Sequence, residues 1–216
     1  MAKKVPVCVF DKIKVYLHVA VMETWEEILY EMLGDMKISE LFYAADVTLV
    51  TVGSDIEPIE GCRIVNTGLP LHSFEFPTLE LLYNELEPNT AVFYCHLKGV
   101  SQPTNIGHRN WRRDMAEFCI VAWRERVAHL HSRWTSGHRL TGGGAGWGSE
   151  FVWAHKHYSG NWWWARANYL KHLMRPSEFL AKYTSRYAAE SWLGQSELMN
   201  EYIDDELFKG VFDEAT

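Results

Sequence analysis

Residues 91–101 read A-V-F-Y-C-H-L-K-G-V-S, and this stretch decides the fold class. Its first five residues have strand-forming character and carry no charge, as in a strand that is buried on both faces of a parallel sheet. His96, Lys98 and Gly99 then end the run. Because open α/β sheets bind ligands just beyond the carboxyl ends of their strands, these three residues are well placed for an anionic ligand. The alternative is a solvated loop with a turn glycine.

The segments around this strand alternate between strand and helix patterns. Runs of β-branched and apolar residues predict strands at residues 15–22, 47–52 and 62–66. Helices are predicted after a T-x-x-E capping box at Thr24 and Glu27, after Glu75, and over about residues 109–131. This alternation predicts an α/β fold with a mostly parallel central sheet flanked by helices.

Two arginines, Arg112 and Arg113, fall near the predicted start of the 109–131 helix. Cations at a helix N-terminus oppose the helix dipole, so one of them is a candidate for holding an anionic ligand. A solvated helix face is the alternative.

Length and composition indicate one globular domain over residues 1–216. Hydrophobic residues make up 47% and charged residues 23%, which excludes disordered and collagen-like classes. The net charge of −7 argues against a nucleic-acid binder, which needs a basic face. Four scattered cysteines without a C-x-x-C pair are typical of reduced core residues, and no stretch approaches the ~20 apolar residues of a membrane span. We therefore expect a cytoplasmic protein.

Aromatic residues are the unusual part of the composition, with ten each of Trp, Tyr and Phe. The densest run is residues 155–170, H-K-H-Y-S-G-N-W-W-W-A-R-A-N-Y-L. Three consecutive tryptophans on a strand place at least one on the opposite face, and Gly160-Asn161 before them lets a ligand approach the backbone. We interpret the trio as a ligand wall, with burial as the alternative, above all for Trp163. The glycine-rich segment 141–149 is interpreted as a mobile lid that carries Trp147.

Four regions together resemble one family. They are M-E-T-W-E-E-I (22–28), E-F-P-T-L-E-L-L-Y (75–83), Y-C-H-L-K-G-V-S (94–101) with N-W-R-R-D-M (110–115), and H-Y-S-G-N-W-W-W-A-R-A-N-Y-L (157–170) with R-Y-A-A-E-S-W (186–192). They resemble nucleotide-sugar glycosyltransferases of the GT-A type. The likeness is to polysaccharide and rhamnan-synthesis transferases, and to related viral and bacterial proteins that carry H-x-K-G where relatives carry D-x-D.

The resemblance implies a single Rossmann-like domain that transfers a hexosyl or deoxyhexosyl group from a nucleotide-diphosphate donor to a glycan or glycoprotein acceptor. A usual GT-A enzyme presents two aspartates to a divalent metal, and this chain has His96 and Lys98 there instead. Lys98 can neutralise leaving-group charge directly, so no residue is assigned to a metal and dependence on Mn or Mg stays open.

The resemblance and the chemistry of the side chains together assign the remaining residues. Glu190, flanked by Arg186 and Trp192, is the candidate catalytic base, with an exposed helix glutamate as the alternative. Lys98 is the second candidate catalytic residue. The candidate donor-binding residues are Glu75, His96, Lys98, Gly99, Arg112 and Arg113. The candidate acceptor-binding residues are His157, Gly160, Asn161, Trp162 and Trp164.

Two other functions stay open at this stage. One is a metal hydrolase that uses His96, His108, His155 and His157, although the spacing lacks a paired carboxylate or H-E-x-x-H. The other is a carbohydrate-binding module without catalysis, which uses the tryptophans. Donor sugar, nucleobase, acceptor and stereochemical outcome also stay open.

Overall fold

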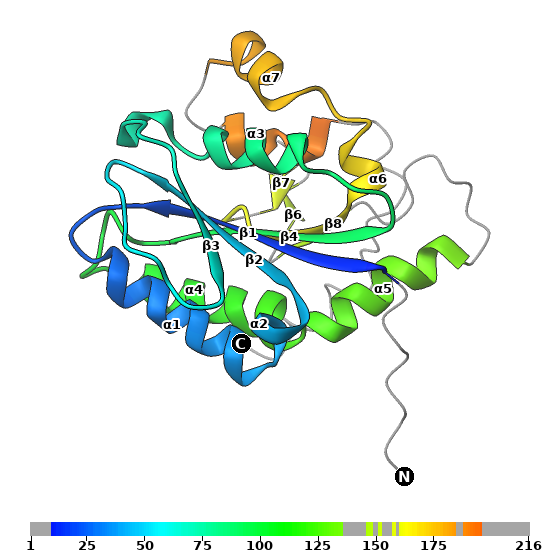
Figure 1. The fold of residues 1–216 in the computed structure, drawn as a ribbon, viewed down its shortest axis with the longest axis horizontal. Coiled ribbons are helices and arrows are strands. Elements are labelled where there is room, and N and C mark those ends of the chain that lie inside the picture. Colours follow the sequence, from blue (N-terminus) through cyan, green and yellow to red (C-terminus); the bar gives the residue numbers. More distant parts are fainter. Residues whose placement is uncertain are drawn as a thin grey trace.

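The computed structural model describes residues 10–135, 146–148, 151–152, 157–158, 160–184 and 188–195. These residues form an α/β fold around a six-stranded sheet of order β3-β2-β1-β4-β8-β5 (Figure 1). Its strands are β1 (Lys12–Ala20), β2 (Asp46–Val52), β3 (Cys62–Asn66), β4 (Thr90–His96), β5 (Gly146–Gly148) and β8 (Trp163–Arg166). The four strands from β3 to β4 are parallel, whereas β8 is antiparallel to β4 and to β5. The mostly parallel sheet expected from the sequence is confirmed.

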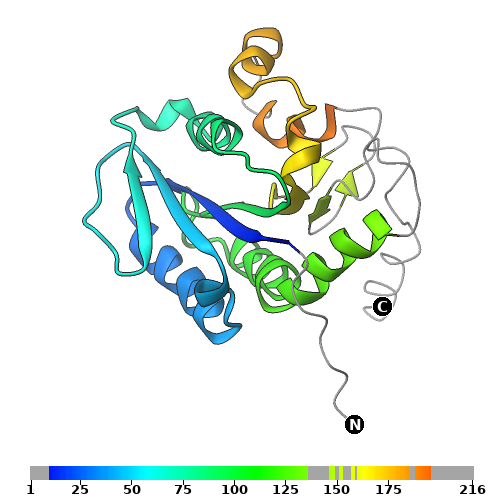
Figure 2. The same cartoon turned by 45° about the vertical axis from the view of Figure 1, so that its right-hand side comes forward.

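Helices cover both faces of this sheet, as Figures 1 and 2 show. One face carries α1 (Trp25–Ile38), α2 (Leu41–Ala44), α4 (Ile106–Ala116), the π-helical turn η2 (Glu117–Val121) and α5 (Trp123–Thr135). The other carries α3 (Phe76–Asn84), α6 (Ala167–Leu170), α7 (Pro176–Lys182) and α8 (Ala188–Ser191). Two short 3₁₀ turns, η1 (Leu71–Ser73) and η3 (Leu193–Gln195), and a separate antiparallel pair, β6 (Phe151–Val152) with β7 (His157–Tyr158), complete the elements. No helix in the described part of the chain is long and apolar enough to span a membrane.

Alternate residues of each strand enter two different hydrophobic cores. In β4, Phe93 and Cys95 pack with the α1 side, whereas Val92 and Tyr94 pack with the α3 side. All four are at most 1% exposed. Because helices cover both faces, β4 needs no polar face, which explains its uncharged sequence.

The order of the strands places a topological switch point between β1 and β4. From β1 the chain passes through α1 to β2 on one side, and from β3 it passes through α3 to β4 on the other side of β1. The connection that leaves the carboxyl end of β1 runs through α1 on one face, whereas the connection through α3 crosses the other face and enters β4 at its amino end, so the strand order reverses between β1 and β4 (Figure 2). Sheets of this kind bind ligands in the crevice at that point.

The helix predicted over residues 109–131 is longer in the structure and is interrupted. It begins at Ile106, where Asn105 caps the His108 N–H, and η2 separates α4 from α5. Side chains bond two carbonyls of this π-helical turn: Trp164 Nε1 donates to Cys119 O at 2.8 Å and Arg126 Nε to Phe118 O at 3.2 Å. Carbonyls that accept from side chains are drawn out of the regular helical ladder, which accounts for the irregular turn.

The capping box predicted at Thr24 and Glu27 is only partly confirmed. The helix α1 does begin directly after Thr24, but the Thr24 hydroxyl makes no cap hydrogen bond. Its backbone, at φ −115° and ψ 19°, is outside the extended conformation that a capping residue normally adopts.

Of the predicted lid at residues 141–149, the structure describes only 146–148. Their backbone forms β5, where Trp147 pairs with Trp164 of β8. The rest of that prediction, with His155 and Arg186, lies outside the described residues.

Candidate functional site

The candidate site lies at the carboxyl ends of β1 and β4, at the switch point. His18 and His96 are register partners there, and Lys98 follows two residues after His96. The strands position these side chains, because a parallel pair ends at one edge of the sheet.

A carboxylate from the α3 face joins this edge. Glu75, the residue before α3, accepts hydrogen bonds at Oε2 from the Tyr94 hydroxyl at 2.5 Å and from Asn161 Nδ2 at 2.6 Å. Asn161 is itself held by Trp163, whose Nε1 donates to Asn161 Oδ1 at 3.0 Å. Residues 75, 94 and 161 are far apart in the sequence, so only the folded sheet brings these groups together.

A tight turn before β8 completes this side of the site. Gly160 and Asn161 both have positive φ, at 78° and 52°. The His96 Nε2–H donates to the Gly160 carbonyl at 2.8 Å. A Cβ on Gly160 would lie 2.5 Å from the Met115 sulfur, so glycine is required there for both conformation and space.

Lys98 is the cation of the site. Its Nζ lies 3.9 Å from the centroid of the Trp111 ring, a cation–π contact. Burial lowers the pKa of Lys98, and the Glu190 and Glu75 carboxylates oppose that shift. Glu190 lies on α8 and is half-buried. The structure therefore brings together Glu75, Lys98 and Glu190, which the sequence places in three separate segments.

Two buried ionisable groups of the site, His18 and Glu75, differ in their charge at neutral pH. Burial lowers the pKa of His18 to about 4, with the nearby Glu75 carboxylate opposing and His96 adding to the shift. Burial also acts to raise the pKa of Glu75, but His96, His18 and the hydrogen bonds from Tyr94 and Asn161 outweigh it, so the Glu75 pKa lies below its usual range. The site at neutral pH therefore contains a neutral His18 and an ionised Glu75.

Acid is expected to destabilise the fold through His18. Between its ordinary pKa of 6.5 and its folded pKa of about 4, the unfolded chain binds a proton at His18 that the folded chain does not. The free energy of unfolding therefore falls as the pH decreases through this window, by up to about 3 kcal/mol for a shift of this size. Denaturant titrations at several pH values from 7 to 4.5 measure the slope.

In His18→Gln this part of the slope should disappear, because glutamine does not titrate. The fold should be kept, because glutamine can still bond Thr78 Oγ1, the 2.8 Å partner of His18 Nδ1. The control is His72→Gln, which changes an exposed histidine and should keep the slope. The lowered pKa of Glu75 affects stability mainly below its ordinary value of 4.5, so a pH-independent stability between pH 6.5 and 4.5 in the wild type would contradict the assignment to His18.

The tryptophan trio does not form the predicted ligand wall. Trp162, Trp163 and Trp164 are 0%, 1% and 0% exposed. Trp162 and Trp164 pack into the core on the α1 side and Trp163 into the core on the α3 side. The sequence argument was right that the trio faces both sides of the sheet, but helices cover both sides, so neither Trp162 nor Trp164 offers a surface to a sugar.

Asn161 and Gly160 are also inside the site rather than on its surface. Asn161 is fully buried, and its amide bonds Glu75 and Trp163. The Gly160 carbonyl is occupied by His96, and Trp111 and Met115 fill the space beside its Cα. Both residues therefore position Glu75 and His96, in place of the sugar contact predicted for them. His157 lies in β7, and only its backbone is described.

Arg112 and Arg113, which the sequence predicted to contact the nucleotide-sugar donor, both lie beside Glu31 in the folded chain. Because α4 begins at Ile106, both arginines lie beyond its first turn and do not oppose its N-terminal dipole. Arg112 is 6% exposed, donates to Lys98 O at 2.9 Å and pairs with Glu31 at 2.6 Å. Arg113 is exposed, with Glu31 at 3.8 Å. Arg112 therefore fixes the loop after β4 to α1, and Gly99, at φ 88°, lets that loop turn.

Two residues of the site were missed in the sequence. His18 was read as part of an apolar strand and Tyr94 as part of the uncharged run. A lone ionisable residue inside a strand buried on both faces was an available signal for His18, since such groups are costly to bury without a partner. Among the described residues no group of three or more His, Cys, Asp or Glu side chains could hold a metal ion.

Comparison with known proteins gives one match. Residues 23–206 match a family described as "Domain of unknown function (DUF8361)". No curated protein and no solved structure matches the chain.

Proposed function

The chain belongs to the DUF8361 family, a domain of unknown function, and from the site itself we propose that it is a glycosyltransferase of the GT-A type. It transfers a hexosyl or deoxyhexosyl group from a nucleotide-diphosphate sugar to a glycan or glycoprotein acceptor. The resemblance of the H-x-K-G and S-G-N-W-W-W segments suggested this reaction, and the geometry of the site supports it.

One observation carries the proposal: Lys98 lies at the switch point with two carboxylates acting on it. Glycosyl transfer needs a positive charge where the diphosphate departs and a base where the acceptor hydroxyl loses its proton. Lys98 supplies the first and Glu190 the second. Glu75 is committed to Tyr94 and Asn161, so it suits a fixed hydrogen-bonding role towards the donor better than proton transfer.

In the proposed step the acceptor oxygen attacks the anomeric carbon as the bond from that carbon to the diphosphate oxygen breaks. The electron pair of the broken bond goes to the diphosphate, beside the Lys98 ammonium. The acceptor proton goes to the Glu190 carboxylate. Trp111 beneath Lys98 limits the positions that the ammonium can take, which favours a preorganised charge.

The two alternative functions have less support. A carbohydrate-binding module would use the tryptophan trio, and those side chains are buried. A histidine-based metal hydrolase would use His96, whose Nε2 is engaged by the Gly160 carbonyl, and His155, which lies outside the described residues.

Lys98→Ala tests the proposal directly. Affinity for a nucleoside diphosphate should fall roughly tenfold to a hundredfold, as expected when a hydrogen bond to a charged group is lost. Calorimetric titration of the wild type with UDP, GDP, CDP and dTDP first identifies the nucleobase, and the preferred compound is then titrated into the variant.

The matched control is Lys171→Ala, which removes an exposed lysine that follows α6. It should bind like the wild type. Equal affinity in Lys98→Ala and the wild type would remove Lys98 from the site, and absence of binding to any of the four diphosphates would argue against a nucleotide-sugar enzyme.

A further inference from the structure

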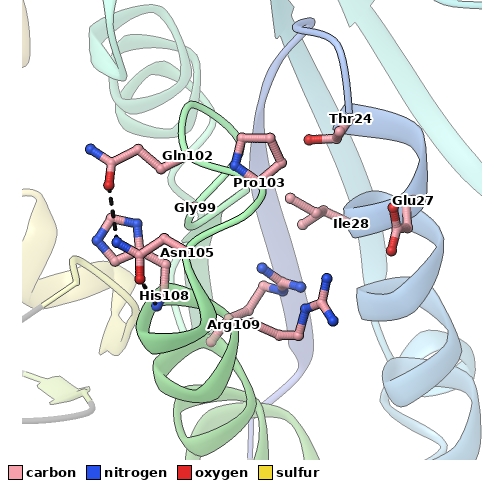
Figure 3. Close-up of a pocket in the computed structure, with 10 residues that line it drawn as sticks. Thr24, Glu27, Ile28, Gly99, Gln102, Pro103, Asn105, His108 and Arg109 are labelled. Carbon is pink, nitrogen blue, oxygen red and sulfur yellow. Dashed lines mark hydrogen bonds between the residues drawn. The ribbon is translucent and has the colours of Figure 1, made fainter.

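A pocket opens on the α1 side of the same sheet edge. It lies between the first turn of α1 and the loop that leads from β4 into α4, as Figure 3 shows. Its volume is about 290 Å³, including the space at its open mouth. None of its lining residues is Lys98, Glu75 or Glu190. The lining side chains used below are Thr24, Glu27, His108, Arg109 and Arg112.

Unsatisfied polar atoms gather at this pocket. In the described part of the chain four buried side-chain nitrogen or oxygen atoms have no hydrogen-bond partner, and three of them belong to lining residues: Thr24 Oγ1, His108 Nδ1 and Arg112 Nε. Arg112 is 94% buried, since it is 6% exposed. Buried polar groups in native proteins are normally paired with protein, water or a ligand, so these three atoms around one cavity are available to water or to a polar ligand.

The charge and the backbone around the pocket indicate the sign of that ligand. Arg109 is exposed at the rim, and within the described residues its guanidinium forms no ion pair. The 14-residue helix α1 begins at Trp25 beside the pocket without a side-chain cap. The Trp25 and Ile28 N–H groups bond Met22 O and Thr24 O, which leaves those of Glu26 and Glu27 as donors at the positive end of the helix dipole. These groups together favour an oxyanion.

We propose that this pocket binds the phosphate group of a small phosphorylated molecule. Arg109 supplies the charge at the rim, Thr24 and Arg112 supply donors inside, and the start of α1 adds backbone N–H groups. A phosphate accepts several hydrogen bonds at once, which matches the number of unused donors. The site goes beyond glycosyl transfer, because its charge and its donors come from Arg109, Thr24, Arg112 and α1, whereas the proposed transfer uses Lys98, Glu75 and Glu190; Arg112 bonds only the backbone carbonyl of Lys98.

Glu27 sets a limit on the charge of the pocket. It lines the cavity from the first turn of α1, and its carboxylate repels an anion. Arg112 is already neutralised by Glu31, so Arg109 is the charge that offsets Glu27. Removing the Glu27 charge should therefore raise the affinity for phosphate, and removing the Arg109 charge should lower it.

The test is calorimetric titration with inorganic phosphate at constant ionic strength, followed by a sugar phosphate. Arg109→Gln should weaken binding about tenfold, the effect of losing one charged hydrogen bond. Glu27→Gln should tighten it. Arg113→Gln removes a charge from the same helix outside the pocket and should bind like the wild type. Tighter binding of the sugar phosphate than of inorganic phosphate would identify a phosphorylated metabolite, and the reverse would identify free phosphate.

Thr24→Val separates a ligand role from a structural one. The Thr24 hydroxyl is unpaired in the free protein, so its removal should leave the free energy of unfolding unchanged or higher while phosphate binding weakens. Lys98→Ala should leave phosphate binding unchanged, which distinguishes this site from the donor site. Phosphate binding that is unaffected by Arg109→Gln and Thr24→Val, or no binding in the wild type, would overturn the proposal.

Discussion

Replacement of Glu190 by Gln is expected to lower glycosyl transfer roughly a hundredfold to ten-thousandfold, the contribution of general-base catalysis. Glutamine keeps the volume and the hydrogen-bonding groups of the side chain but cannot accept the acceptor proton. Glu190 is half-buried on α8. Its carboxylate opposes the lowering of the Lys98 pKa by burial, and it adds to the raising of the Tyr94 pKa by burial. It therefore lies close to the group that we assign to the departing diphosphate.

The measurement is the turnover of a nucleotide sugar at saturating acceptor, together with donor affinity and stability of the variant. Folding should survive in Glu190→Gln, so the loss should appear in kcat. The matched control is Glu178→Gln, an exposed glutamate in the first turn of α7, which should keep full turnover. A rate within about threefold of the wild type would assign the base elsewhere or indicate a retaining mechanism that needs no base from the protein.

Replacement of Trp164 by Ala is expected to lower the free energy of unfolding by about 3–5 kcal/mol, the usual cost of removing a large buried aromatic side chain. Trp164 is fully buried and stacks on Phe93 with ring centroids 4.9 Å apart and planes at 11°. Its Nε1 also donates to Cys119 O in η2, so the variant leaves a cavity and an unpaired carbonyl. Denaturant unfolding of the variant measures the loss.

The exposed Tyr43 on α2 provides the control, since it is 74% exposed and Tyr43→Ala should change stability by no more than about 0.5 kcal/mol. The same pair of variants separates the core from the ligand-wall interpretation of the tryptophans. A Trp164→Ala protein with normal stability and weakened acceptor binding would contradict the buried placement.

The pattern along the chain was enough to predict the first four strands, the helices α1 and α3, and the edge of the sheet at which Lys98 lies. Strands β2 and β3 fall where their β-branched runs predict them, to within one residue, and α1 begins directly after Thr24. Local periodicity determines these features, because the alternation of apolar residues depends on neighbours a few positions away. The end of the uncharged run at His96 likewise determined where Lys98 lies relative to the sheet.

The partners of the site residues could not be read in the same way. Arg112 was expected at a helix start, yet it lies beyond the first turn of α4 and pairs with Glu31, which is 81 positions away in the sequence. Asn161 was expected to meet a sugar, yet it holds Glu75, 86 positions away. Such contacts depend on which helix packs beside which strand, and no local pattern encodes that choice.

The sequence by itself determined an α/β fold, the strand that ends at His96, and the presence of Trp162, Trp163 and Trp164 on alternating faces of the sheet. Only the tertiary structure decided that both faces are covered, that Glu75 meets Tyr94 and Asn161, and that unpaired polar atoms belong to residues around a pocket beside α1. The physical reason is that periodicity assigns a residue to a face, whereas burial and pairing depend on what packs against that face.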